Sequence, residues 1–453
     1  MSNNSFLNFT KEDFALSTDL YELTMAAAYF DNNIDQRSVF ELFVRELPGN
    51  RGYLVFAGLE QVIEYLQTLR FSGAQIDYLK SLPYFKNVNP DFFEYLREFK
   101  FQGDVDAMRE GSIFFANEPV LRIEGGAIEA QIVETFLLSV VNFQSLIATK
   151  TARIVSVAEG RPVIEFGLRR AHTPLAGLMG ARASIIGGAE TTSNVLAAER
   201  LGLVPSGTMA HSWVMSFKEE ADAFSAFLKV FPGFTIFLID TYDTIKAVKT
   251  VIKMGLKGFD GVRIDSGNME NTSHEVRRIL DKGGLEKVKI FSTGDLNENI
   301  IESLVKAKSP IDGFGVGTEL ITSRDDPALG GIYKLVAIKK DGVYSYRLKK
   351  SERKETIPGL KQIYRFKDKK YYSHDLISEI NEKPLKGGEP LIYPVMRNGK
   401  LIQSLPDIKE AVNRCRDSLK LFSQNVRDIH NPAHYQVKIS PHLEYLAETI
   451  AVS

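Results

Sequence analysis

One pattern repeats between residues 163 and 318, and it constrains the fold of this chain more than any other feature. A short apolar run is followed by a polar or glycine-containing cluster, and each cluster by a stretch whose apolar residues have helical spacing. The clusters recur about every 25 residues, the length of one strand plus one helix. Their central residues are His211, Asp240, Asp265, Asp295 and Thr318. This alternation is typical of parallel strands covered by helices, so we expect an α/β fold here.

The polar clusters are expected to meet at one edge of the predicted sheet, because parallel strands place all their carboxyl ends on the same side. A single cluster says little, since Asp, Gly and Ser are common turn residues and Asp is a common helix cap. Five clusters in phase are harder to explain by chance. The sequence therefore predicts a shared site built from strand ends.

The residue types in the clusters suit a substrate that carries several phosphates. Arginine forks onto phosphate or carboxylate, and glycines before helices expose backbone N–H groups that bind phosphate. Aspartates among phosphates suggest Mg²⁺. The residues concerned are Arg169, Arg170, Arg263, Asp240, Asp243, Asp265, Asp295, Gly267, Gly294, Gly315 and Gly317. The chain has no Gly-x-x-x-x-Gly-Lys motif, and no Gly-x-Gly-x-x-Gly follows its first strand.

His211 stands among small and hydroxylated residues in segment 207–213, next to Trp213. We expect a short strand at residues 201–204 and a helix at 217–231, which would place His211 where a strand gives way to a helix. Ligands bind at such positions in α/β folds. An isolated histidine is more often a buried donor to a backbone carbonyl, but the neighbouring clusters favour a functional role.

Composition excludes several classes of function. Lys and Arg number 56 against 57 Asp and Glu, so a formal net charge of -1 favours neither nucleic acid nor an anionic membrane. One cysteine, Cys415, allows no internal disulfide and no cysteine-based zinc site, which fits a reducing compartment. Neither a targeting segment nor a run approaching the length of a membrane span is expected. The sequence predicts a soluble, cytoplasmic protein.

We expect three regions along the chain. Residues 1–126 read as an N-terminal α+β domain, with helices at 13–30, 58–69 and 91–99 and strands at 37–47, 112–115 and 120–123. Residues 127–330, which open with a long helix at 128–148, form the α/β catalytic domain. Residues 331–453 form a C-terminal extension, part of which packs on the first domain.

The C-terminal extension carries weaker signals. Strands at 331–340 and 342–349 are expected to form a hairpin turned by Asp341 and Gly342. A charge run at 349–355 is interpreted as a solvated face, and residues 407–423 as a helix. His430, His434 and His442 lack metal-ligand spacing.

Taken in order, the segments resemble the nicotinate phosphoribosyltransferase family. Each segment alone is weak, whereas the ordered series is specific and spans nearly the whole chain. The segments are residues 17–25, 165–172, 192–196, 207–213, 262–267, 293–295, 314–318 and 431–432. The resemblance implies an irregular α/β barrel with an N-terminal α+β domain, and a homodimer whose sites lie at the subunit interface.

The resemblance also implies a reaction. Nicotinate and 5-phosphoribosyl 1-diphosphate would give nicotinate mononucleotide and diphosphate, the first step of NAD salvage, with ATP as co-substrate. His211 matches the histidine that ATP phosphorylates. Tyr21, contributed across the dimer, matches an aromatic that stacks on the pyridine ring, and Phe166 would form the other wall of that slot. Thr208 and Arg263 match positions near nicotinate, and Gly315, Gly317 and Thr318 match a phosphate-holding loop.

Chemical reasoning adds roles to this set. Arg169 and Arg263 are candidates for binding nicotinate or the diphosphate, and Asp265 and Asp295 for the ribose or for Mg²⁺. Ser266 and Gly294 complete the expected phosphoribosyl diphosphate site. Phosphorylation of a histidine needs one ring nitrogen held by a hydrogen bond, which Asp240 or Asp243 could supply. A helix-capping or turn role for these two aspartates is equally compatible with the sequence.

One loop departs from the family pattern. Residues 187–193 read Gly-Gly-Ala-Glu-Thr-Thr-Ser, whereas Gly-Gly-Phe-Asp-Gly-Thr-Ser is usual in the family. Ser193 aligns with an aspartate of the related nicotinamide enzymes, and its lack of charge favours an acid as substrate. Two alternatives stay open: a transferase for nicotinamide or quinolinate, and a catalytically silent sugar-phosphate binding protein.

Overall fold

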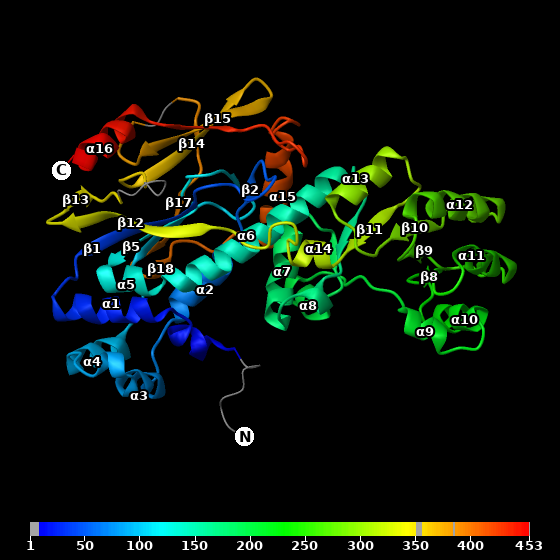
Figure 1. Cartoon of the computed structure of the whole chain (residues 1–453), viewed down its shortest axis with the longest axis horizontal. Coiled ribbons are helices and arrows are strands. Elements are labelled where there is room, and N and C mark those ends of the chain that lie inside the picture. The colour runs from blue at the N-terminus through cyan, green and yellow to red at the C-terminus, as the bar shows by residue number, and fades with distance from the viewer. Residues whose placement is uncertain (1–8, 350–355, 384–385, 453) are drawn as a thin grey trace. The chain divides into compact units, whose positions relative to one another are not determined.

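The computed structural model describes residues 9–349, 356–383 and 386–452 (Figure 1). Two compact units divide the chain: Met1–Ser145 with Ala328–Ser453, and Leu146–Pro327. The region 331–453, which sequence analysis sets apart, therefore shares one unit with the N-terminal part of the chain. Most of the charge run at 349–355 lies outside the described residues.

The first unit is built on a seven-stranded antiparallel sheet in the order β13-β12-β1-β5-β3-β17-β18. Its strands are β1 (Arg37–Val44), β3 (Asp104–Ala107), β5 (Leu121–Gly126), β12 (Gly331–Lys340), β13 (Val343–Tyr346), β17 (Tyr393–Arg397) and β18 (Lys400–Leu401). The expected hairpin of the C-terminal extension is confirmed as β12 and β13. Because β12 also pairs with β1, segments far apart in sequence share one sheet, and Val39 and Val336 are buried together.

Smaller elements complete the first unit. A four-stranded sheet has the order β16-β14-β15-β19, and a two-stranded sheet pairs β2 with β4. Their bounds are β2 (Leu54–Val55), β4 (Ile113–Phe114), β14 (Lys361–Asp368), β15 (Tyr371–Glu379), β16 (Glu389–Pro390) and β19 (Gln436–Ile439). The helices are η1 (Lys11–Leu16), α1 (Leu20–Asp31), α2 (Leu59–Thr68), α3 (Gly73–Ser81), η2 (Pro83–Phe85), α4 (Pro90–Glu98), α5 (Ala127–Ile132), α15 (Ile408–Lys420) and α16 (Pro441–Val452).

The expected helix at 13–30 is divided in the structure. A 3-10 helix ends at Leu16, and α1 begins at Leu20 with Asp19 in the N-cap position. The Thr18 hydroxyl between them donates to the Glu22 carboxylate. Thr and Asp are more common at a helix start than in a helix interior, which agrees with the break at residues 17–19.

We expected no segment as long and apolar as a membrane span, and this expectation is wrong. Residues 127–157 form a nearly continuous helical stretch, α5 followed by α6 (Glu134–Val157), and it is long and apolar enough to cross a membrane. However, 67% of its most apolar window is buried inside the protein. This burial is that of a core helix.

The second unit contains a six-stranded sheet in the order β7-β6-β11-β10-β9-β8, and every pairing in it is parallel. The strands are β6 (Val163–Glu165), β7 (Thr191–Thr192), β8 (Ile236–Leu238), β9 (Gly261–Ile264), β10 (Lys289–Ser292) and β11 (Gly313–Val316). The mixed α/β fold with parallel strands is confirmed. Across the described part of the chain β7 and β8 are not paired with each other, so the barrel is irregular.

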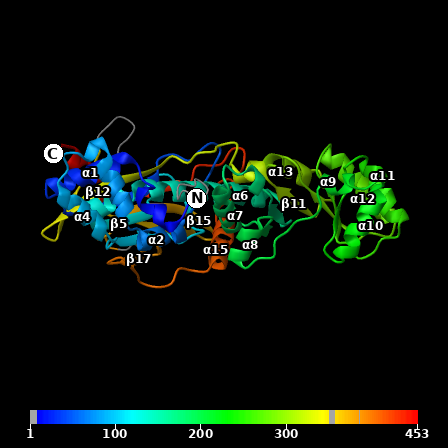
Figure 2. The same cartoon turned by 90° about the horizontal axis from the view of Figure 1, so that it is seen from below.

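Helices connect these parallel strands. They are η3 (Leu168–Arg170), α7 (Pro174–Ile186), α8 (Val195–Leu201), α9 (His211–Met215), α10 (Glu220–Val230), α11 (Thr244–Lys253), α12 (Met269–Lys282), α13 (Glu298–Lys306) and α14 (Thr318–Ile321). Figures 1 and 2 both show α11 and α12 side by side, and the two helices are in contact. Phe237, Val262 and Ile290 on successive strands are fully buried in the core beneath them.

The strand expected at 201–204 is not formed. Leu201 ends α8, Gly202 takes the left-handed conformation that closes the helix, and an extended segment runs from there to His211. A short apolar run alone cannot distinguish a strand from the end of a helix.

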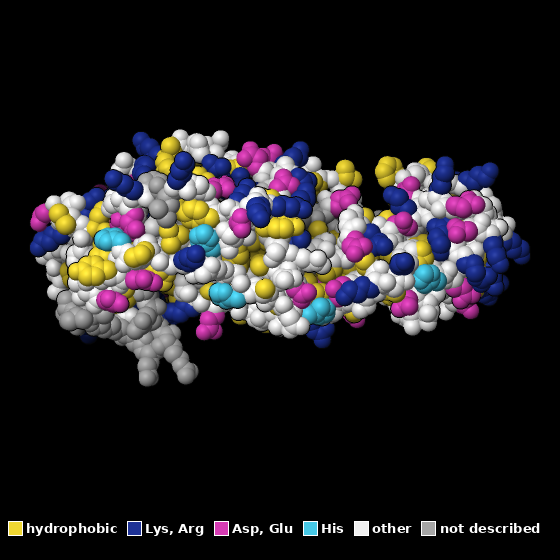
Figure 3. Space-filling model, turned by 90° about the horizontal axis from the view of Figure 1, so that it is seen from above, with side chains coloured by type: hydrophobic (Ala, Val, Ile, Leu, Met, Phe, Trp, Pro, Cys, Tyr) yellow, Lys and Arg dark blue, Asp and Glu magenta, His cyan; other side chains and the backbone are white. Residues whose placement is uncertain are grey.

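Basic and acidic side chains are interspersed on the face drawn in Figure 3, in keeping with the formal net charge of -1.

Candidate active site

A cavity of about 710 Å³ in the second unit collects most of the residues that the sequence analysis selects. It is lined by Phe166, Arg169, Arg170, Ser193, Gly207, Thr208, Met209, Ala210, His211, Ser212, Arg263, Asp265, Thr293, Gly294, Asp295, Gly315, Gly317 and Thr318. Most of them follow the carboxyl end of a parallel strand. The prediction that the polar clusters meet at one site is thus confirmed for the clusters at His211, Asp265, Asp295 and Thr318.

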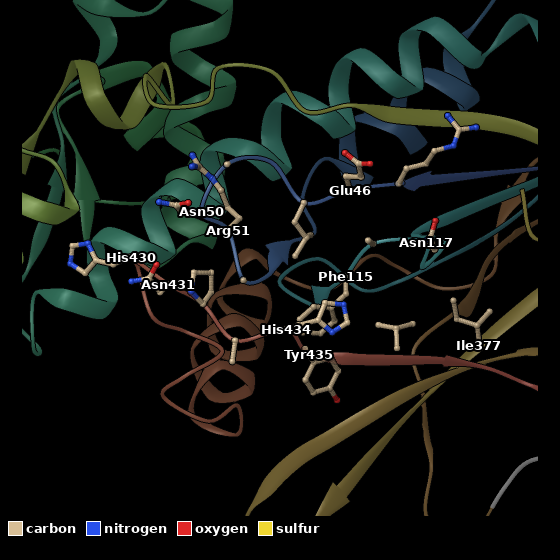
Figure 4. Close-up of a pocket in the computed structure, with 18 of the residues that line it drawn as sticks. Glu46, Asn50, Arg51, Phe115, Asn117, Ile377, His430, Asn431, His434 and Tyr435 are labelled. Carbon is tan, nitrogen blue, oxygen red and sulfur yellow. The ribbon is translucent and has the colours of Figure 1, made fainter. Parts of the chain in front are cut away.

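A second cavity, of about 720 Å³, lies within the first unit and is shown in Figure 4. Residues 45–52, 115–117 and 430–435 form most of its wall, with the rings of Phe115 and Tyr435 stacked 4.2 Å apart at their centroids. It contains none of the predicted site residues. The two cavities have nearly the same volume, so volume does not identify the active site. The residues that line them do.

His211 is the first residue of α9, and its imidazole is accessible from the cavity, with 39% of the side chain exposed. The ring nitrogen Nδ1 lies 3.2 Å from the Thr241 hydroxyl, within hydrogen-bond distance. The other nitrogen, Nε2, lies 3.8 Å from Oδ2 of Asp265, beyond hydrogen-bond distance but close enough for an ion pair with a protonated ring. One nitrogen is held and the other faces the cavity.

The predicted hydrogen bond from Asp240 or Asp243 to the histidine is wrong. Asp243 caps α11 by accepting from the Lys246 amide at 2.8 Å. Asp240 instead braces the next cluster, since its Oδ2 accepts from the Asp265 amide at 2.9 Å and from the hydroxyl of Ser266 at 2.7 Å. Neither aspartate lines the cavity.

Thr241 is a residue that sequence reasoning missed, although it stands between these two aspartates in the same cluster. The signal that could have found it is the hydroxyl itself, because a histidine nitrogen can be oriented by Thr as well as by a carboxylate. Sequence reasoning also assigned no role to the side chain of Thr293, which lines the cavity. Its hydroxyl donates to Oδ1 of Asp265 and fixes that carboxylate beside His211.

Arg263 supplies a cation at the cavity wall. Its Nη2 donates to the carbonyl of Met209 at 3.2 Å, and its Nε has no hydrogen-bond partner among the described residues. Burial lowers the pKa of Arg263, a tendency that the nearby carboxylates of Asp265 and Asp240 oppose and Arg169 reinforces. A desolvated guanidinium with an unused donor is suited to bind an anionic ligand group.

The loop after β10 can have no side chain at Gly294. A Cβ there would lie 1.9 Å from the Asp265 carbonyl oxygen, and the backbone has a φ of 87°. Asp295 follows with a φ of 47°, an uncommon conformation for a residue with a side chain. The backbones of the β9 and β10 loops are therefore in direct contact at the cavity floor.

Gly315 brings a strand backbone against an aromatic ring. A Cβ at this position would lie 2.5 Å from the Phe166 ring, so the ring lies flush on β11. Thr318 begins α14 and lines the same cavity, as does Gly317. The structure thus places the predicted aromatic wall beside the predicted phosphate loop.

Tyr21 is not among the residues lining this cavity. It lies on α1 in the first unit, with 45% of its surface exposed. Ser266 is also outside the lining, and its hydroxyl donates to Asp240. Thr208 does line the cavity, but its hydroxyl donates to the carbonyl of Ile236.

Oxygen ligands for a cation are few. In the part of the chain that the structure describes, no three His, Cys, Asp or Glu side chains gather as a metal site. Asp265 and Asp295 both line the cavity and could hold a cation that takes its remaining ligands from substrate phosphates and water, as Mg²⁺ commonly does.

Comparison with known proteins decides the family. Models of the nicotinate phosphoribosyltransferase N-terminal domain, the nicotinate phosphoribosyltransferase family and the C-terminal domain match residues 16–142, 162–350 and 387–447. A nicotinate phosphoribosyltransferase from Mycobacterium tuberculosis is 42% identical over 94% of this chain and 91% of its own. The chain belongs to the nicotinate phosphoribosyltransferase family.

Other proteins similar to this chain match it over most of its length. The Bacillus subtilis enzyme is 38% identical, covering 95% of this chain and 94% of its own. The crystal structure of human nicotinic acid phosphoribosyltransferase superposes with a TM-score of 0.83 at 27% identity, over 96% and 99% of the two chains. A nicotinate-nucleotide pyrophosphorylase from Pyrococcus furiosus gives a TM-score of 0.76 at 28% identity, over 93% and 99%.

Proposed function

We propose that this chain is an ATP-coupled nicotinate phosphoribosyltransferase. It joins nicotinate to 5-phosphoribosyl 1-diphosphate, giving nicotinate mononucleotide and diphosphate, the first step of NAD salvage in the cytoplasm. The observation that carries the proposal is the single cavity in which His211, Arg263 and Thr318 meet, although they are far apart in sequence. A nucleophile, a cation and a phosphate loop are the groups this reaction needs.

The pyridine ring of nicotinate binds against Phe166, and its carboxylate is received by an arginine. Arg169 and Arg263 both line the cavity, and Ser193 at its rim carries no charge that would repel an acid. The second face of the ring is covered by Tyr21 of a second copy of the chain. The exposed position of Tyr21 on α1 leaves its ring accessible to such a partner.

The phosphoribosyl diphosphate binds along the loops after β10 and β11. Gly294, Gly315, Gly317 and Thr318 line this side of the cavity. We assign the phosphate contacts to the glycine-containing backbone and to the Thr318 hydroxyl. Asp265 and Asp295 would hold Mg²⁺, which neutralises phosphate charge when it is bound. The carboxylates also face the positive charge that develops on the ribose as the diphosphate leaves.

His211 carries the coupling to ATP. We assign the ring proton to Nδ1, which lies 3.2 Å from the Thr241 hydroxyl and would donate to it. The lone pair of Nε2 is then available to attack the γ-phosphorus of ATP. An N–P bond forms as the bond from that phosphorus to the bridging oxygen of ADP breaks, and ADP leaves. Water later cleaves the N–P bond and releases phosphate.

Labelling with γ-phosphate-labelled ATP tests this step. Wild-type protein is expected to acquire an acid-labile phosphohistidine, and His211→Ala is expected to lose it. His274→Ala is the matched control, because His274 is exposed on α12 and does not line the cavity. Label that persists in His211→Ala would remove the histidine from the mechanism.

Quinolinate and nicotinamide are the competing acceptors. Rates with nicotinate, quinolinate and nicotinamide, each with and without ATP, separate the possibilities. We expect nicotinate-dependent release of diphosphate that ATP stimulates. Turnover of quinolinate or nicotinamide in preference to nicotinate would reassign the enzyme, and no turnover of any base would leave a silent binding protein.

A further inference from the structure

The carboxyl group of Glu165 lies directly behind the wall of the proposed base slot. Glu165 is the last residue of β6, and it has no exposed surface. Glu165 itself does not line the cavity, but two residues close to it do. Phe166 follows Glu165 in sequence, and Ser193 follows Thr192, the hydrogen-bond partner of Glu165. A buried carboxylate at this position needs partners, because an unpaired one is costly.

Both oxygens of the carboxyl group accept a hydrogen bond, each from a different edge of the cavity. We call these edges the Phe166 lip (residues 166–167) and the Ser193 lip (residues 192–193). The Gly167 amide donates to Oε1, which closes the turn that carries Phe166. The Thr192 hydroxyl donates to Oε2 at 2.5 Å, which fixes the end of β7. The backbone adds a third link, because the Ser193 amide donates to the Glu165 carbonyl oxygen at 2.9 Å.

The hydrogen bonds continue beyond Thr192 into a helix. The Thr192 hydroxyl accepts from the Asn194 amide at 2.9 Å, and the Asn194 side chain accepts from the Ala197 amide at 3.2 Å, capping α8. The Ser193 lip is therefore anchored on one side by a capped helix and on the other by Glu165. Displacing the carboxylate would remove the side-chain link to β6 and leave the backbone hydrogen bond from the Ser193 amide.

The Phe166 lip is held by close packing as well. A Cβ at Gly167 would lie 2.4 Å from a side-chain carbon of Ile321 and 2.7 Å from Oε1 of Glu165, so the turn is pressed between them. The Phe166 amide donates to the Val316 carbonyl at 2.8 Å. With its ring flush on Gly315, Phe166 has little room to move unless the carboxylate behind it moves.

We propose that Glu165 is a positioning residue that fixes the spacing between Phe166 and Ser193 and so determines how well a flat aromatic acid fits between them. The inference rests on the proposed function, since it concerns the same slot. Glu165 contacts no substrate and takes no part in phosphorylation of His211, whose partners Thr241 and Asp265 follow other strands. Glu165 therefore affects the binding of nicotinate and not the reaction of His211 with ATP.

Glu165→Gln alters the carboxylate at the centre of the clamp, and Thr192→Val removes the hydroxyl that links Glu165 to the Asn194 amide. Thr192→Ser keeps this hydroxyl. We expect the KM for nicotinate to rise about tenfold in the first two variants, which is the effect of one buried hydrogen bond left unmade. The KM for 5-phosphoribosyl 1-diphosphate and the labelling of His211 by ATP should stay within about twofold of wild type. Thr192→Ser should restore the nicotinate KM.

Glu298→Gln is the matched control, because Glu298 is a buried carboxylate of the same unit that bonds Lys150 and Arg153 and does not line the cavity. It is expected to lower the thermal midpoint without a selective rise in the nicotinate KM. An unchanged nicotinate KM in Thr192→Val would overturn the inference. So would a parallel rise in the KM of every substrate in both clamp variants, since that is general loosening.

Calorimetric binding of nicotinate to the same variants distinguishes this result from failure of the proposed function. If wild type binds nicotinate but turns over none, the proposed function fails, while weaker binding in Thr192→Val still supports the clamp. If wild type turns nicotinate over and the variants bind it as tightly as wild type does, the proposed function stands and the clamp fails. Thr192→Val also keeps the test valid should Glu165→Gln not fold.

Discussion

Glu22 should make the stability of the first unit depend on pH in the neutral range. Its carboxylate has no exposed surface and sits beside α5 and α6, where it accepts from the Thr135 amide at 2.8 Å, from the Thr135 hydroxyl at 2.6 Å and from the Thr18 hydroxyl. Burial raises its pKa from 4.5 to about 7 despite these hydrogen bonds, and the nearby Glu134 carboxylate raises it further. The folded state therefore retains a proton that the unfolded chain releases.

The sign of the effect follows from the two pKa values. The contribution of Glu22 to stability is fully present below about pH 4.5 and is lost as the pH rises toward about 7. Each pKa unit corresponds to about 1.4 kcal/mol, so the whole window amounts to about 3 kcal/mol. Glu22→Gln removes the titration. The stability of the variant should therefore change less with pH than that of wild type.

Denaturant unfolding at about pH 5 and about pH 8 measures the difference. Wild type should lose about 2 to 3 kcal/mol more than Glu22→Gln between the two conditions. Glu98→Gln is the control, since Glu98 is exposed at the end of α4 in the same unit and its removal should leave the wild-type response intact. Equal pH dependence in all three proteins would show that Glu22 does not titrate in this range, and the reasoning from burial would be refuted.

Three further outcomes are expected. Thr241→Val should slow phosphorylation of His211 about tenfold through loss of one orienting hydrogen bond, and Thr241→Ser should restore it, as measured by the rate of labelling from ATP. Gly294→Ala should cost about 2 kcal/mol or more in thermal unfolding, because its Cβ meets a carbonyl oxygen of the β9 loop; Gly267→Ala, with a similar positive φ but open space, should cost less. A mixture of Tyr21→Ala and His211→Ala chains should regain activity if each site combines two chains, and no gain over the separate variants would contradict the shared site.

The strand-end site could be predicted from the sequence because its geometry follows from one local rule. Parallel strands joined by helices present every carboxyl end on the same side, so the spacing of polar clusters was sufficient to bring His211, Asp265 and Thr318 into one cavity. No long-range contact had to be inferred individually. The same rule explains why Phe166 and Gly315 are neighbours, since each lies at the end of the parallel pair β6 and β11.

Pairings that depend on distant segments could not be predicted. The strand β12 joins β1 across almost three hundred residues of sequence, and nothing local in residues 331–340 indicates that partner. Side-chain orientation was equally hidden: Asp240, Thr241 and Asp243 are three candidates in four residues, and only the backbone path determines that Thr241 reaches the imidazole. Capping of α11 by Asp243 illustrates how an ordinary local role competes with a functional one.

The order of the strands constrains how ATP hydrolysis can drive the transfer. The strands of the parallel sheet lie in the order β7-β6-β11-β10-β9-β8. Phe166 and Ser193, the walls of the base slot, follow β6 and β7, whereas Thr241 and Asp265, the partners of His211, follow β8 and β9. The proposed phosphate loops, those after β11 and β10, occupy the middle. On the proposed function, phosphorylation of His211 therefore acts first on the diphosphate end of the sugar substrate. Variants at the two ends should accordingly separate, with those at Glu165 changing the nicotinate KM and those at Thr241 changing the dependence on ATP.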